Sequence, residues 1–141
     1  MADYFTNFSV ALSLPNEAAQ AYALELAHQA DQGRQEEPLP ENFPQALADV
    51  LEDWNFETEA DDPASEHGLW LHSYNGGVDA LCAFLQHLLQ KYDPSGRVTF
   101  EWSHDCSKPR LDAYGGGAAI VTAQEIKTMN TGQWLAEHTT P

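Results

Sequence analysis

Residues 78–92 constrain the fold more than any other stretch of the sequence. Their apolar side chains recur every three or four positions, at Val78, Leu81, Cys82, Leu85, Leu88, Leu89 and Tyr92. This spacing predicts an amphipathic helix whose apolar stripe must be buried against another element. Pro94-Ser95-Gly96 follows at once and is expected to end the helix.

Several stretches alternate apolar and polar side chains with a period of two, which predicts strands. Residues 5–14 and 97–103 show this alternation, and 118–121 form a short buried-type strand after Gly115-Gly116-Gly117. Residues 69–74 predict a further strand with Trp70, His72 and Tyr74 on one face, either packed in the core or left open to solvent. Residues 55–63 allow either an edge strand or an extended loop.

The remaining helices are predicted from their end signals. Asn16 is placed to cap a helix that ends near Gly33, and a short helix is expected over 45–53. Thr122 and Glu125 have the spacing of a capping box, which predicts a final helix. That helix would carry Ile126, Met129, Trp134 and Leu135, and both Trp134 and Trp102 are expected in the core.

The order of these elements predicts the fold class. Strands and helices follow one another as β-α-α-(β)-β-α-β-β-α, which favours an α+β fold in one domain over residues 1–141. We expect a small mixed or antiparallel sheet of about four strands, with the helices packed on one face.

The acidic residues gather in the first half of the chain. The 141 residues carry a net charge of −16, and residues 1–79 account for −15 of it, with 16 acids and Arg34 as their one base. Residues 80–141 hold six acids and five bases. The segment 36–66 holds eleven acids and no base. A halophilic or simply solubilising surface would distribute its charges more evenly.

This segment suggests an anionic binding surface. If residues 57–61 are extended, Glu57, Glu59 and Asp61 repeat at roughly 6.6 Å, about twice the phosphate spacing along one DNA strand. They would then fit a basic groove built for nucleic acid. The predicted partner-binding residues are Glu52, Asp53, Trp54, Glu57, Glu59, Asp61, Asp62, Glu66 and Trp70, with Trp54 or Trp70 as anchors.

Blander interpretations of the acidic segment stay open. It is equally consistent with a solvated loop that has no partner, or with a structural accessory protein whose acids only keep it dissolved. Loose cation binding is a further alternative. Residues 53–59 alternate somewhat like a calcium loop, but Thr58 stands where that loop requires glycine.

No catalytic, cofactor or metal motif is complete in this sequence. The predicted protein is therefore a non-enzyme that needs no cofactor and no metal. The alternative is a small enzyme or anionic-ligand site built from His104, Cys106, Lys108 and Arg110. The glycine run at 115–117 precedes a strand, so it is expected to be a tight turn or a close backbone approach and not a phosphate loop.

A block near the C-terminus carries a resemblance. Residues 100–110 (FEWSHDCSKPR), followed by Gly115-Gly116-Gly117 and residues 120–122, resemble a block in small uncharacterised acidic proteins of phages and plasmids. The block lies in about the last third of the chain. The resemblance implies a mobile-element context and transfers no catalytic residue. Mobile elements also carry acidic inhibitors, including anti-CRISPR and anti-restriction proteins that mimic DNA, and the first half resembles these in charge only.

Together these features predict a cytoplasmic inhibitor that occupies a basic surface of a host defence protein, in the manner of a DNA mimic. Its charge argues against direct binding to nucleic acid or membranes. The N-terminus lacks a signal-peptide pattern, and Cys82 and Cys106 are expected to be free thiols. The oligomeric state is left open.

Overall fold

A mixed helix-and-sheet architecture is present in the computed structural model, which describes residues 4–60, 66–108 and 114–139. In chain order its elements are β1 (Tyr4–Ser13), α1 (Glu17–Arg34), α2 (Gln45–Ala48), the 3-10 helix η1 (Leu51–Asp53), β2 (Glu57–Ala60), β3 (Gly68–Ser73), α3 (Val78–Tyr92), β4 (Arg97–Cys106), β5 (Gly115–Thr122), β6 (Ile126–Asn130) and α4 (Thr131–His138). The predicted α+β class is confirmed.

The described strands form one antiparallel sheet in the order β2-β3-β1-β4-β5-β6. It has six strands, compared with the expected four or so. The two edge strands account for the difference. β2 lies in the stretch that the sequence left open between strand and loop, and β6 lies in the stretch predicted as helix.

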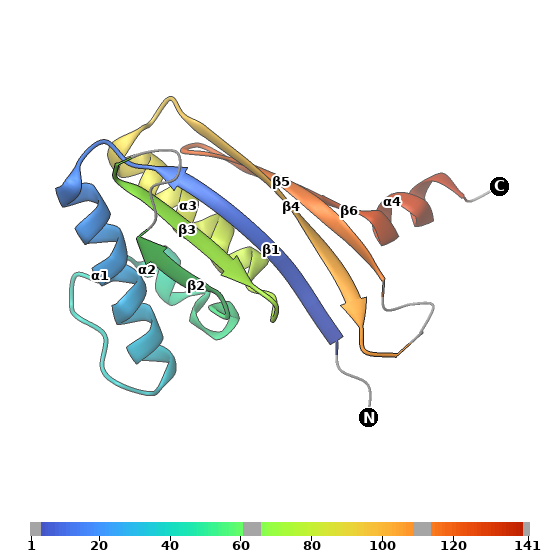
Figure 1. Cartoon of the computed structure of the whole chain (residues 1–141), viewed down its shortest axis with the longest axis horizontal. Helices are drawn as coiled ribbons and strands as arrows, with labels where there is room; N and C mark the ends of the chain where they lie inside the picture. Colours follow the sequence, from blue (N-terminus) through green and yellow to red (C-terminus); the bar gives the residue numbers. More distant parts are fainter. Residues whose placement is uncertain (1–3, 61–65, 109–113, 140–141) are drawn as a thin grey trace.

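One face of the sheet is covered and the other is open. Along β1, Phe8, Val10 and Leu12 are buried, whereas the side chains between them are exposed. Figure 1 shows α3 crossing behind the sheet and α1 beside its β2–β3 end. The predicted stripe of α3 is confirmed, because Leu81, Leu85 and the other apolar residues of its inner face are buried.

The chain from Thr122 to Asn130 corrects the predicted capping box. The Thr122 Oγ1 atom accepts hydrogen bonds from the backbone N–H groups of Gln124 and Glu125, at 3.3 and 3.0 Å. These bonds close the turn of a β5–β6 hairpin, and residues 126–130 pair with β5 as a strand. The helix begins only at Thr131, where the Asn130 side chain caps it by accepting from the Gln133 N–H at 2.7 Å.

Two further expectations were wrong, one for Trp134 and one for the helix over residues 45–53. Trp134 is half exposed on α4 and is not a core residue, whereas Trp102 is partly buried against the core as predicted. The short helix expected over 45–53 is divided into α2 and η1.

His87 gives the fold a predicted pH dependence. Its Nε2 atom lies 2.7 Å from the Tyr22 hydroxyl, between α3 and α1. Burial, and then the Lys91 charge, lower the pKa of His87. The unfolded chain therefore binds more protons below about pH 6.5, so this contribution to stability is complete above that pH and is lost as the pH falls through the folded-state pKa.

We expect the free energy of unfolding to decline as the pH falls below about 6.5, with His87 contributing at most about 1.4 kcal/mol per pH unit, the limit for one proton. His87→Gln keeps a polar partner for Tyr22 and does not titrate, so its decline should be shallower. Urea unfolding at several pH values measures both slopes. Equal slopes for the two proteins would contradict the assignment.

Candidate functional site: the acidic face of β2 and β3

Two glutamates and two ring side chains form what we call the acidic face, defined as Glu57, Glu59, Trp70 and His72. The register of β2 against β3 places Glu57 opposite His72 and Glu59 opposite Trp70, so all four point to the open side of the sheet. The Glu57 and Glu59 side chains are 77% and 52% exposed. The condition set for the acidic segment, that its alternate carboxylates lie on one side of an extended stretch, is met for Glu57 and Glu59, and Asp61 lies outside the described residues.

The rings of the acidic face are held in place by their neighbours. Trp70 and His72 stack with centroids 3.8 Å apart, and the Trp70 Nε1–H donates to Ser9 Oγ at 2.8 Å. The His72 Nε2 atom lies 2.7 Å from Glu59 Oε2 and 3.9 Å from Glu57 Oε2. Trp70 remains 37% exposed. The face therefore presents a fixed indole beside two solvent-accessible carboxylates, which suits contact with a basic, partly apolar surface.

The same side chains include a donor set for a metal ion. Within the described residues, Glu57, Glu59 and His72 are the one group of three whose ligand atoms lie within 4.8 Å of one another. One imidazole nitrogen and two carboxylate oxygens suit a divalent transition metal. His72 was expected on one strand face with Trp70 and Tyr74, but its place beside the two glutamates depends on the β2–β3 register and was not predicted.

Trp54 was predicted as a binding anchor, and this was wrong. It is 1% exposed and packs on Phe56 and Phe84, with ring centroids 4.9 and 5.1 Å away. Its carbonyl oxygen accepts a hydrogen bond from Arg34 Nη1 at 2.6 Å. Arg34, the one base of residues 1–79, therefore hydrogen-bonds to the backbone of a core residue. Of the two candidate anchors, only Trp70 is accessible.

The other predicted acids are not all on the acidic face. Asp53 Oδ2 accepts the Ala80 N–H at 3.0 Å and so caps the start of α3. Glu52 lies exposed in the neighbouring η1, and Glu66 lies exposed before β3 with its Oε2 atom 3.9 Å from His67 Nε2. Asp61 and Asp62 lie outside the described residues.

The charge split along the sequence becomes a split in space. Four elements of the acidic half, residues 1–79, lie on one side of β1, namely α1, α2, β2 and β3 (Figure 1). The elements β4, β5, β6 and α4 lie on its other side. The molecule therefore has one strongly anionic side, which would orient it toward a basic partner before contact.

The alternative ligand site is only partly assembled. The His104 Nδ1 atom lies 2.9 Å from Thr6 Oγ1, and His104 lines a cavity of about 530 Å³ together with Trp102 and Tyr114. Cys106 and Lys108 do not line this cavity, and Arg110 lies outside the described residues.

In the described residues, Cys82 belongs to the core and the glycine run allows close packing. Cys82 and Cys106 are free, and burial raises the pKa of the Cys82 thiol to about 12, which makes it a poor nucleophile. The close backbone approach predicted for the glycine run is confirmed at Gly117, where an added Cβ would meet the Trp102 ring and the Met129 carbonyl oxygen.

Comparisons with known proteins add no assignment. No family model, no curated protein and no solved structure matches the chain. The resemblance of residues 100–122 to phage and plasmid proteins therefore stays a prediction. Among the helices within the described ranges, none is both long and apolar enough to cross a membrane.

Proposed function

We propose that this protein is a non-enzymatic binding protein whose acidic face occupies a basic surface of a partner protein. The partner of matching chemistry is a nucleic-acid-binding protein with a groove lined by Lys and Arg. A host defence protein inhibited by a product of a mobile element is one such case. In this proposal, Glu57 and Glu59 take the place of backbone phosphates and Trp70 supplies the anchoring contact.

One observation carries the proposal: two exposed carboxylates stand at alternate positions on a strand, directly beside a half-exposed indole. Alternate strand positions are about 6.6 Å apart. Because Trp70 is stacked and hydrogen-bonded, little side-chain freedom remains to be lost when a partner binds. Like charges at this spacing repel one another, and a basic partner would relieve that repulsion.

Reversal of the two charges tests the proposal. We expect Glu57→Lys/Glu59→Lys to weaken partner binding at least about tenfold, because attraction is replaced by repulsion at the contact. The matched control is Glu101→Lys/Glu125→Lys, which changes the net charge equally on exposed acids of β4 and the β5–β6 turn. This control should retain binding.

The measurement is a pull-down from host lysate at low salt, repeated at about 0.5 M salt, where screening is strong. Duplex DNA added as a competitor should release the captured protein, and salt should weaken its capture. Equal losses for the two double variants would indicate an unspecific charge effect and would contradict the assignment to the acidic face. Capture that DNA cannot compete would refute the nucleic-acid-binding class of partner.

A further inference from the structure

The ladder between β1 and β4 stops early. β1 pairs with β3 as far as Ser13, but its register with β4 ends at Asn7 opposite Ser103. Both strands continue well beyond that pair, to Ser13 and back to Arg97. Within the described residues, the second half of β1 is therefore not paired with β4, its neighbour at the centre of the sheet.

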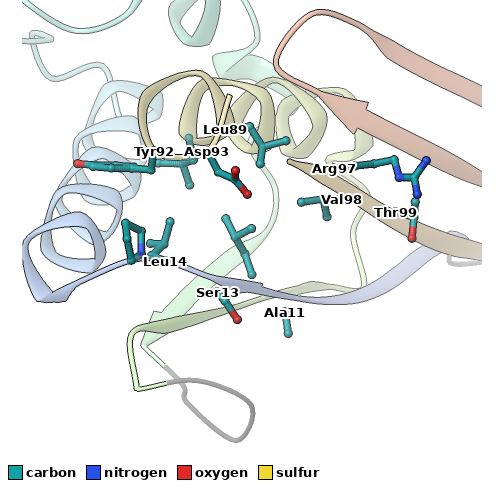
Figure 2. Close-up of a pocket in the computed structure, with 12 residues that line it drawn as sticks. Ala11, Ser13, Leu14, Leu89, Tyr92, Asp93, Arg97, Val98 and Thr99 are labelled. Atoms are coloured by element: carbon teal, nitrogen blue, oxygen red, sulfur yellow. The ribbon is translucent and has the colours of Figure 1, made fainter. Parts of the chain in front are cut away.

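A cavity of about 330 Å³ lies where the strands separate, bounded by the C-terminal end of α3 (Figure 2). Its lining includes Leu12 and Val98 from the covered side of the sheet and Ala11 and Thr99 from the open side. Figure 2 shows the side chains of Ala11 and Ser13 pointing away from Leu89, so these two residues border the opening between the strands with their backbone.

Backbone carbonyl groups of β1 face this opening. Thr6 N–H donates to the Tyr74 carbonyl and Leu14 N–H to the His67 carbonyl, so even-numbered positions of β1 direct their backbone toward β3 and the chain leading into it. Ala11 and Ser13 therefore direct their N–H and C=O groups toward the cavity. These groups have no partner in the β1–β4 register, and both residues are exposed, so their carbonyl oxygens are accessible to a donor on a ligand.

A carboxylate is aimed into the same space. Figure 2 shows the Asp93 side chain pointing into the cavity between Leu89 and Val98, whereas Arg97 extends away from it. None of the ion pairs among the described residues involves Asp93. The apolar part of the lining includes the branched aliphatic residues Leu12, Leu14, Leu88, Leu89 and Val98.

We propose that this cavity binds a primary ammonium group carried on an apolar stem. The ammonium would donate to the Asp93 carboxylate and to the carbonyls of Ala11 and Ser13, and the stem would lie on the leucine lining. The net charge of −16 favours a cation over an anion at this site. The volume is at the lower end for ligand pockets, which fits a chain of a few carbons.

Two sources share this chemistry: a free alkylamine and a lysine side chain of a partner. The site uses none of the acidic-face residues, so the inference does not depend on the proposed function. Ala11 lies opposite Trp70 in the β1–β3 register, so the cavity is bordered by the strand next to the acidic face.

The test is a titration of the ¹⁵N-labelled full chain with hexylammonium, followed by amide chemical shifts. We expect saturable shifts at Ala11, Ser13, Leu89 and Val98. Hexanol and hexanoate, which have the same chain without the positive charge, should bind at least about tenfold more weakly. Asp93→Asn should weaken hexylammonium binding by a similar factor.

The control is Glu137→Gln, which removes an equal charge from an exposed position of α4, a helix with no residue in the cavity lining, and should leave the affinity within about twofold. A second titration uses the capped peptide acetyl-Gly-Lys-Gly-amide. Binding of both probes supports a lysine of a partner, and binding of hexylammonium alone supports a free amine. The proposal is overturned if hexylammonium gives no saturable shift at the cavity, if its shifts spread over residues 36–60 instead, or if Asp93→Asn has no effect.

Discussion

Replacing Trp54 by alanine is expected to lower the free energy of unfolding by about 3–5 kcal/mol, the range for a large aromatic side chain removed from a core. The indole is 1% exposed and stacks on Phe56, so its loss leaves a cavity that neighbouring rings cannot fill. Because position 54 is buried, the alanine variant gains no compensating contact with water. Since whole domains are stable by only about 5–15 kcal/mol, this single change removes a large share of the total.

Trp70→Ala is the matched comparison, because it deletes the same side chain from the open face of the sheet. We expect it to cost about 1 kcal/mol or less in stability, the value of one exposed hydrogen bond to Ser9 and one ring contact, and to weaken partner binding instead. Urea unfolding of both variants separates the two roles. Similar losses of stability would show that the two tryptophans are not divided between core and surface as the structure places them.

The parts of the fold that were predictable from the sequence are those set by local periodicity. The stripe of α3 and the alternation of β1 are complete within their own residues, and each becomes the element that its pattern predicts. Burial on one side of each element then follows from the pattern itself.

β6 was not predictable in this way, because its residues take their structure from a neighbour. Without β6, the outer side of β5 would be an open edge, and pairing with it outweighs the helix signal of Thr122 and Glu125. The same spacing that caps a helix elsewhere closes a hairpin turn here, since Thr122 Oγ1 bonds to the N–H groups of the turn.

The candidate site shows the same division. The alternation of Glu57 and Glu59 is local, so their common direction was predictable from the sequence. The nearness of His72 depends on strand register, and the burial of Trp54 depends on rings from α3 and the chain before β2. The opening between β1 and β4 has no sequence signature at all, because both strands keep their alternation while the distance between them grows.

Gly117→Ala is expected to lower the free energy of unfolding by about 2–3 kcal/mol, as overpacking of a close contact does. Gly117 lies between β4 and β6, where an added methyl group would overlap the Trp102 ring on one side and the Met129 carbonyl oxygen on the other. The carbonyl belongs to the backbone of β6 and cannot rotate away, so the strand pairing itself must shift. We therefore expect the β5–β6 hairpin to loosen first, seen as faster amide exchange in β6.

Gly132→Ala is the control, because an added Cβ there makes only ordinary contact with Asn130 and lies in helix α4. It should leave stability unchanged or raise it by up to about 1 kcal/mol, since alanine favours a helix over glycine. A second comparison isolates the ring: if Trp102 causes part of the strain, Gly117→Ala should cost less in a Trp102→Leu background than in the wild type. Equal costs in both backgrounds would assign the strain to the Met129 carbonyl alone. A Gly117→Ala variant as stable as the wild type would contradict the close contacts of Gly117 with Trp102 and Met129.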